Sequence, residues 1–238
     1  MRAVIMAGGK GKRLFPYTLV LPKPLVPLGE KPILDIVLRQ LAHAGFDHIT
    51  ITVGYHAELI MAVMGDGSNL GIKIDYALES KPLNTIGPLT QVKDLNEPFL
   101  VMNGDLLTNL DYKMLYETHL ANQTIATVAT HKRHVRLSLG VVRFDGDHRI
   151  NGFQEKPEYD YDVSMGIYIF NPEILEHIPK GEPFGFDQLI LRLLDQQVPV
   201  AAYPFTGNWL DMGTMDDLNR AMEEFEANKA LYLPGEPA

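Results

Sequence analysis

Basic residues gather between positions 10 and 31 of a chain that is acidic overall. The stretch holds five of them against a single acidic residue, Glu30, whereas the formal net charge of the whole chain is −9; the five are Lys10, Lys12, Arg13, Lys23 and Lys31. Three glycines, Gly8, Gly9 and Gly11, follow an apolar run at residues 3–6. Glycine lets backbone N–H groups approach an anion closely. The pattern predicts a buried strand that ends in a phosphate-binding turn.

Two common phosphate-binding motifs do not explain this turn. A P-loop has a glycine five positions before Gly11 and a serine or threonine after Lys12, but this chain has Met6 and Arg13 there. A dinucleotide fingerprint that starts at Gly9 has Leu14 in place of its third glycine.

A second candidate site follows the apolar residues 99–102, where the chain reads Asn103-Gly104-Asp105. Ligands of open α/β sheets bind beyond the carboxyl ends of the strands. A carboxylate at such an end can hold Mg²⁺, and it can equally cap the turn that follows. The residues alone leave both interpretations of Asp105 open.

The elements that must position these residues alternate between strand-like and helical patterns. Strand patterns occur at residues 3–6, 49–53, 72–78, 99–102, 124–131, 163–170 and 198–205. Helical patterns occur at residues 33–44, 56–64, 111–120, 172–178, 187–194 and 216–228, and a loop at residues 79–89 leads into a further helix that runs to residue 92. This alternation predicts an α/β fold with a mixed, mostly parallel sheet flanked by helices.

Composition limits the function classes. The chain has 238 residues, 46% of them apolar, which suits one large domain. It has no cysteine, which excludes disulfides and thiolate chemistry. The acidic net charge argues against nucleic acid or an anionic membrane as a partner. No apolar run approaches 18 residues and no signal-peptide pattern is present, so a cytoplasmic protein is expected.

The glycine-rich turn belongs to a longer pattern. Gly8-Gly9-x-Gly11-x-Arg13-Leu14-x-Pro16-x-Thr18 is followed by Pro22-Lys23-Pro24-Leu25 and Lys31-Pro32-Ile33-Leu34. This resembles the signature of the sugar-1-phosphate nucleotidyltransferases, also called NDP-sugar pyrophosphorylases. The resemblance implies a single Rossmann-like catalytic domain over residues 1–222. Residues 223–238 are then the end of a C-terminal helix and a frayed tail, without a β-helix extension.

The resemblance also implies the substrates and their residues. The substrates are a nucleoside triphosphate and a sugar 1-phosphate, with Mg²⁺ as cofactor. Catalysis is assigned to Arg13, Lys23 and Asp105, and Mg²⁺ to Asp105 and Asp211. Nucleotide binding is assigned to Ala7, Gly8, Gly9, Gly11, Lys12, Arg13, Lys23, Asn84, Thr85, Gly87 and Asp105. The sugar phosphate is assigned to Gly140, Glu155, Lys156 and Gly166.

The choice of base is less specific. The family often has Leu-Gly-Thr-Ala-Gly near the base, whereas this chain has Leu83-Asn84-Thr85-Ile86-Gly87. Residues 101–109 and 164–214 resemble guanylyltransferases that act on mannose 1-phosphate or a related sugar phosphate. Uridylyl and thymidylyl transfer stay open.

Two other functions are alternatives. One is a catalytically silent homologue that senses nucleotides. The other is a metal-dependent glycosyltransferase, because Asp160-Tyr161-Asp162 matches the short Asp-x-Asp motif of those enzymes. A homo-oligomer is compatible with either of these functions and with the nucleotidyltransferase.

Overall fold

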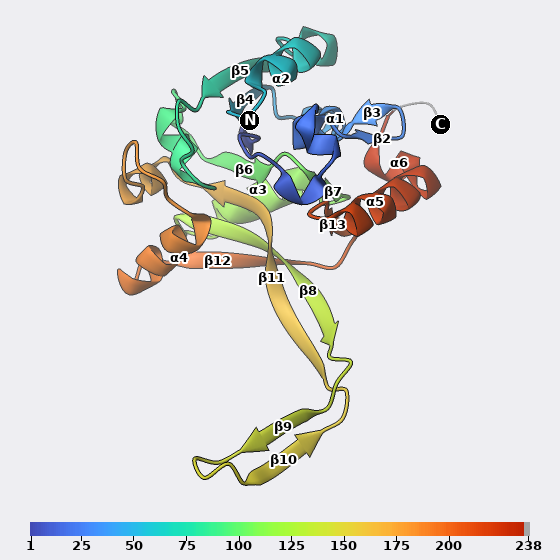
Figure 1. Cartoon of the computed structure of the whole chain (residues 1–238). Helices are drawn as coiled ribbons and strands as arrows, with labels where there is room; N and C mark the ends of the chain where they lie inside the picture. The colour runs from blue at the N-terminus through green and yellow to red at the C-terminus, as the bar shows by residue number, and fades with distance from the viewer. Residues whose placement is uncertain (236–238) are drawn as a thin grey trace.

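The central element is a seven-stranded mixed sheet, seen in a computed structural model that describes residues 1–235 (Figure 1). The strand order is β12 (Val200–Phe205), β8 (Ala126–Arg136), β11 (Glu158–Phe170), β6 (Phe99–Asn103), β1 (Arg2–Met6), β4 (His48–Val53) and β5 (Lys73–Leu78). Strand β11 is antiparallel to β6 and β8, and the other pairs are parallel. The predicted fold class is confirmed.

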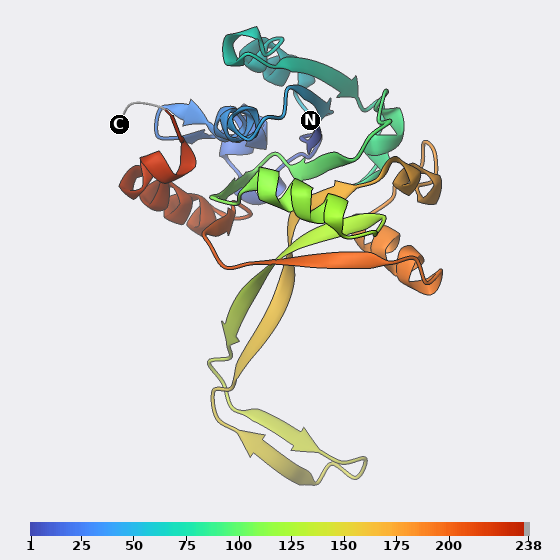
Figure 2. The same ribbon diagram turned by 180° about the vertical axis from the view of Figure 1, so that it is seen from behind.

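Helices pack on both faces of this sheet (Figure 2). On one face, α1 (Ile33–His43), α2 (Ala57–Met64) and α3 (Tyr112–Ala121) form a core with Ala3 and Ile5 of β1. On the other face, α4 (Phe186–Asp195) packs in a cluster with Val4. Because β1 is central and covered on both sides, all three of these β1 side chains are fully buried.

A third apolar cluster fixes the C-terminal helices against the N-terminal third of the chain. Helices α5 (Met215–Ala227) and α6 (Lys229–Tyr232) contribute Phe225 and Tyr232, which pack with Leu14, Leu28 and Ile33. The expectation of a frayed tail is therefore wrong as far as Leu233, which is 4% exposed. Residues 236–238 of that expected tail lie outside the described residues.

Several short elements connect the larger ones. The short strands are β2 (Pro27–Leu28), β3 (Lys31–Pro32), β7 (Leu106–Thr108) and β13 (Trp209–Asp211). The 3₁₀ helices are η1 (Lys12–Leu14), η2 (Tyr17–Leu19), η3 (Lys23–Leu25), η4 (Ser68–Leu70), η5 (Gly87–Gln91) and η6 (Pro172–His177). Elements η5 and η6 replace predicted α-helices. Both have a proline, which lacks the N–H donor, at their first or second position, and both stop within six residues.

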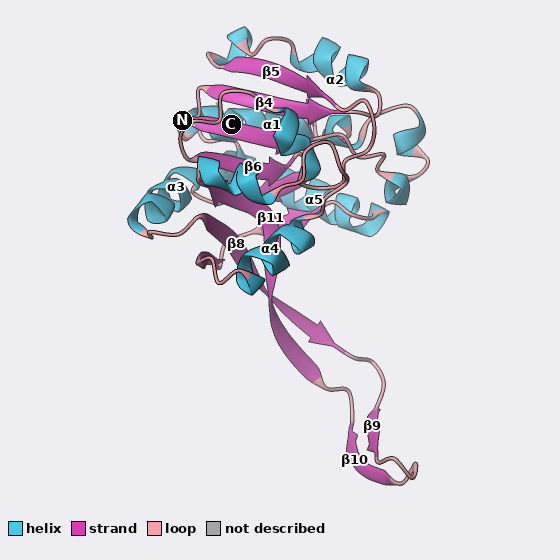
Figure 3. Cartoon of the chain, turned by 90° about the vertical axis from the view of Figure 1, so that its left-hand side faces the viewer, coloured by secondary structure: helices cyan, strands magenta, loops and turns pink. Residues whose placement is uncertain are grey.

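Strands β8 and β11 continue beyond the sheet as a two-stranded ribbon (Figure 3). The ribbon ends in a hairpin of β9 (Val141–Phe144) and β10 (Ile150–Gln154). We call residues 132–162 the arm. The sequence predicted strands only at 124–131 and 163–170, so both strands are longer than expected. No helix among residues 1–235 is long and apolar enough to cross a membrane.

Candidate active site

A pocket of about 840 Å³ lies at the carboxyl ends of the central strands. Met6 ends β1 and Asn103 ends β6, while Gly54 and Glu79 directly follow β4 and β5; all four residues line the pocket. Nine predicted site residues line it as well: Ala7, Gly8, Gly9, Gly11, Arg13, Lys23, Asn84, Thr85 and Asp105. Gly87 does not line the pocket and is buried. The side chain of Lys12 lies outside the described part of the structure.

The turn after β1 passes close to neighbouring side chains at two of its glycines. A Cβ atom on Gly8 would lie 1.9 Å from Oε1 of Glu79. Gly11 has a φ of +57°, and a Cβ there would lie 2.9 Å from the Thr18 side chain. Thr18 Oγ1 also donates a hydrogen bond of 3.0 Å to the Gly11 carbonyl. The turn therefore keeps its backbone close to neighbouring side chains and open to the pocket.

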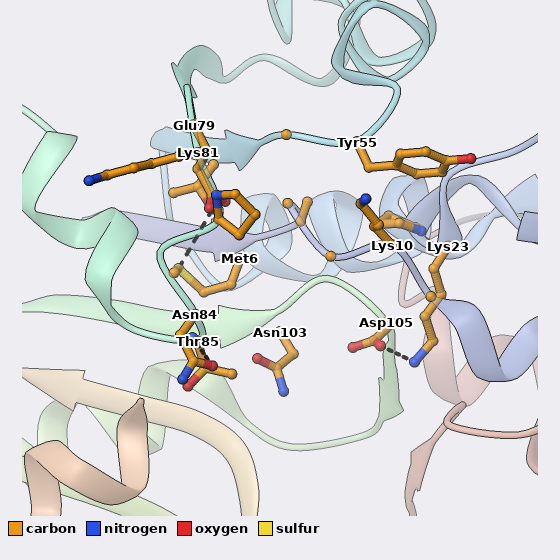
Figure 4. A pocket seen from close by; sticks show the side chains of 18 of the residues that line it. Met6, Lys10, Lys23, Tyr55, Glu79, Lys81, Asn84, Thr85, Asn103 and Asp105 are labelled. Carbon is orange, nitrogen blue, oxygen red and sulfur yellow. Dashed lines mark hydrogen bonds and ion pairs between the residues drawn. The ribbon is translucent and has the colours of Figure 1, made fainter. Parts of the chain in front are cut away.

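Lys23 joins two carboxylates that are far apart in the sequence. Its ammonium group forms an ion pair with Asp105, and its Nζ lies 4.0 Å from Oδ1 of Asp211 (Figure 4 shows Lys23 and Asp105). Lys23 is only 9% exposed. Asp105 follows β6, and Asp211 reaches the same place because β13 pairs with β7, with Asp211 opposite Leu106. The structure thus brings together a predicted cation and both predicted metal ligands.

The environment of Asp211 is electrostatically unusual. Burial and the nearby charge of Asp105 raise the pKa of Asp211, while Lys23 and Arg13 lower it by a smaller amount. Arg13 lies beside this segment, because a Cβ on Gly213 would be 3.1 Å from its Nη1. Two carboxylates that repel one another in a partly buried site favour a further cation.

The donor set suits Mg²⁺. Among residues 1–235 no group of three or more His, Cys, Asp or Glu side chains could hold a metal ion. Magnesium, however, is typically bound by one or two carboxylates together with substrate phosphates and water. Asp105 and Asp211 supply two carboxylates beside a turn suited to phosphate. These residues fit the expected ion.

Several pocket residues were not predicted from the sequence. They are Lys10, Tyr55, Glu79, Lys81 and Asn103, all labelled in Figure 4. Glu79 accepts a hydrogen bond of 3.3 Å from the Leu83 N–H, and burial raises its pKa. The strand-end rule that selected Asp105 also applies to Glu79, which directly follows β5.

The predicted sugar-phosphate residues are divided between two places. Gly166 lies next to the pocket residue Asn103, since a Cβ on Gly166 would be 2.6 Å from its Nδ2. Gly140, Glu155 and Lys156 lie on the arm, which points away from the body (Figures 1 and 3). Lys156 Nζ lies 3.8 Å from Oε1 of Glu155. The structure does not bring these three to the pocket, and their role stays a prediction.

The Asp-x-Asp match has no site around it. Asp160 and Asp162 lie within β11 on the arm. Asp160 forms a hydrogen bond with the His134 ring, and neither aspartate lines the pocket.

Comparison with known proteins agrees with this geometry. The family model described as nucleotidyl transferase matches residues 2–228. The chain is 34% identical to a UTP–glucose-1-phosphate uridylyltransferase of Synechocystis sp., over 99% of this chain and 66% of that one. It is 33% identical to a mannose-1-phosphate guanylyltransferase of Mycobacterium tuberculosis, over 92% of this chain and 62% of that one. The chain thus spans slightly less than two thirds of either relative.

Solved structures share the fold. A Bacillus anthracis protein in complex with sucrose superposes with a TM-score of 0.77 at 23% identity, covering 100% of this chain and 97% of that one. HddC from Yersinia pseudotuberculosis superposes with a TM-score of 0.72 at 26% identity, covering 94% of this chain and 99% of that one. Because the family model matches residues 2–228, the chain belongs to the nucleotidyl transferase family.

Proposed function

We propose that this protein transfers a nucleotidyl group from a nucleoside triphosphate to a sugar 1-phosphate, giving an NDP-sugar and pyrophosphate. The observation that carries this proposal is the meeting of Arg13, Lys23, Asp105 and Asp211 beside the turn at residues 8–11. A pocket with this mixture of charges is suited to holding two polyanions together.

The chemistry needs charge neutralisation rather than a nucleophilic side chain. A phosphate oxygen of the sugar 1-phosphate attacks the α-phosphorus, the bond to the β-phosphate oxygen breaks, and pyrophosphate leaves. The second pKa of a phosphate monoester is near 6, so the attacking oxygen is already largely ionised at neutral pH. The protein has to overcome repulsion between the substrates and hold them in line.

The residues divide this work. The turn at residues 8–11 would bind the triphosphate through backbone N–H groups, and Arg13 would neutralise the departing pyrophosphate. Lys23 would bind the α-phosphoryl region. Asp105 and Asp211 would hold Mg²⁺, which when bound neutralises phosphate charge. Lys156, which was predicted to bind the sugar phosphate, lies on the arm and has no part in this proposal.

Guanine is the base that we propose, and Glu79 supports it. Figure 4 shows Lys23 and Asp105 on one side of the pocket and Glu79 and Asn84 on the other, so the triphosphate and its base would lie on different sides. Guanine presents adjacent N1–H and N2–H₂ donors, which one carboxylate can accept together. Uracil and thymine present a single N–H between two carbonyl oxygens, and those two oxygens repel a carboxylate.

Relatives support the same pairing. The family includes mannose-1-phosphate guanylyltransferases at 33–35% identity, and HddC has been crystallised with GMP-PN. Mannose 1-phosphate or a related sugar phosphate is therefore the proposed acceptor. The uridylyltransferase at 34% identity makes UTP with glucose 1-phosphate the second candidate.

A pyrophosphate-release screen tests the proposal. Purified protein with Mg²⁺ is assayed with GTP, UTP, dTTP and ATP against a panel of sugar 1-phosphates, and the Lys23→Ala protein controls for contaminating activity. Release with GTP and a hexose 1-phosphate supports the full proposal. Release only with UTP or dTTP supports the reaction and contradicts the base. No release in any pairing contradicts the reaction, and NDP-sugar consumption without pyrophosphate indicates a glycosyltransferase.

A further inference from the structure

The arm has two chemically different faces along its ribbon. In the antiparallel register, Val135 lies opposite Tyr159 and Arg133 opposite Tyr161, so these side chains share one face. The alternate positions pair basic with acidic residues: Lys132 with Asp162, His134 with Asp160 and Arg136 with Glu158. One face of the ribbon therefore carries opposed basic and acidic residues, while the other carries apolar and aromatic groups together with Arg133.

The hairpin at the end of the arm repeats this division. Phe144 lies opposite Ile150 and Val142 opposite Phe153. We call these four side chains the tip face. They are 61%, 72%, 42% and 66% exposed respectively. On the opposite face, Val141 lies beside Arg143 and opposite Gln154.

The hairpin is locally well ordered. Asp145 Oδ1 accepts hydrogen bonds of 3.0 Å from the N–H groups of Asp147 and Arg149, which fixes the turn between β9 and β10. The His148 ring stacks on Phe144 at a centroid distance of 5.9 Å. The tip face is thus held in one arrangement by its own turn.

Nothing in the described part of the chain covers the tip face. The arm points away from the body in all three views (Figures 1, 2 and 3). Eight of the 21 large apolar side chains that are exposed in the described structure lie in the arm, which has 31 of the 238 residues. A two-stranded hairpin without a packed face is marginally stable in water. Such a concentration marks an interaction surface.

We propose that the tip face packs against the tip face of a second copy of this chain, forming a two-fold symmetric dimer. Charge supports a second copy as the occupant. Residues 141–154 hold two basic and two acidic residues, and the whole arm holds six of each, so the entire net charge of −9 is on the body. The arms are therefore the neutral part through which two copies can approach while their bodies stay apart.

The symmetry of the contact supports the same occupant. A two-fold interface requires only that one patch be complementary to itself. The tip face satisfies this condition, because its four side chains are apolar and two identical apolar patches do not repel one another. This inference concerns assembly, and it does not depend on the proposed reaction.

Sedimentation velocity over a range of concentrations tests the dimer. The unmodified protein is expected to dimerise, and the dimer is expected to persist in 0.5 M salt because the contact is apolar. The double variant Val142→Glu, Phe144→Glu should raise the dimer dissociation constant at least about 100-fold. The matched control Val141→Glu, Gln154→Glu, on the opposite face of the same hairpin, adds the same charge and should leave it unchanged. A monomer at every concentration overturns the proposal, as does an equal effect of both double variants.

Thiol labelling gives a test that alters the hairpin less. The chain has no cysteine, so Val142→Cys and Val141→Cys each introduce a single thiol on neighbouring positions and opposite faces. The thiol at 142 should react at least about tenfold more slowly than the thiol at 141 in concentrated protein, and dilution should remove that protection. Equal rates overturn the proposal. Protection that survives dilution shows that the chain covers its own arm and also overturns it.

Discussion

Lys23 Nζ lies 4.0 Å from Oδ1 of Asp211. The short pairing of β13 with β7 holds Asp211 at this position. The same ammonium group forms an ion pair with Asp105. Three residues from separate parts of the sequence therefore form one charged cluster at the edge of the pocket. Had Lys23 been remote from the two aspartates, the proposed reaction would have had no site.

Replacing Lys23 with alanine should lower kcat by about 10²- to 10³-fold, because one preorganised electrostatic contact to the reacting phosphate is lost. Steady-state kinetics with the active substrate pair measures this. Lys113→Ala, an exposed lysine on α3, is the control and should retain parental turnover. Turnover of Lys23→Ala near that of the control would remove Lys23 from the reaction.

Asp105→Asn should weaken the response of the enzyme to Mg²⁺, because one of the two carboxylates proposed to hold the ion becomes neutral. The measurement is activity as a function of Mg²⁺ concentration at fixed substrate. Asp216→Asn, on the exposed side of α5, is expected to give the parental titration. The assignment of Asp105 to the metal fails if its own titration is unchanged.

Glu79→Gln should lower kcat/KM for GTP by about 10- to 100-fold, because the amide presents a donor where guanine also presents donors. The ratio of kcat/KM for GTP to that for UTP should fall in the same direction. Glu97→Gln, an exposed residue outside the pocket, is the control. An unchanged ratio would show that Glu79 does not read the base.

His119 should make the fold sensitive to acid. It is 2% exposed and hydrogen-bonds Thr127 Oγ1 and Asn171 Oδ1, and burial lowers its pKa below the ordinary 6.5. As pH falls through 6.5, His119 becomes protonated in the unfolded chain, whereas in the folded chain it stays neutral until a lower pH. The free energy of unfolding therefore decreases on that side of 6.5.

Urea denaturation at pH 7.5 and 5.5 measures this loss. In His119→Gln, which cannot titrate, the midpoint should fall less between the two values than in the parent. His43→Gln, at an exposed position, should behave like the parent. Equal falls in the parent and His119→Gln would exclude burial of a neutral imidazole as the cause.

Local patterns were sufficient to predict the centre of the molecule. The apolar run before Gly8 became the buried strand β1, and Asp105 lies at the end of β6, because strand periodicity and the strand-end rule depend on nearby residues. Glu79 was accessible to the same rule and was overlooked. The segments that begin at Gly87 and Pro172 are 3₁₀ helices instead of the predicted α-helices, because helical periodicity alone does not distinguish the two helix types.

The arm could not be predicted in the same way. The alternation of side-chain types in residues 132–136 and 158–162 is compatible with two strands. It does not predict whether a third strand of the sheet pairs with them. Resemblance to the family's motifs assigned Gly140, Glu155 and Lys156 to the sugar phosphate, whereas the length of β8 and β11 carries them outward. That length is a property of pairing between distant segments.

The pairing of β13 with β7 also sets an order of events during synthesis. The phosphate-binding turn is among the first residues made, whereas Asp211 is added when only about a tenth of the chain remains to be made. A chain that ended at Phe205 would contain all seven strands of the sheet, but its lysine would face a single aspartate. The charged cluster is finished last, so an abbreviated product that ended before Trp209 would lack Asp211 and the C-terminal helices that pack against the N-terminal third of the chain.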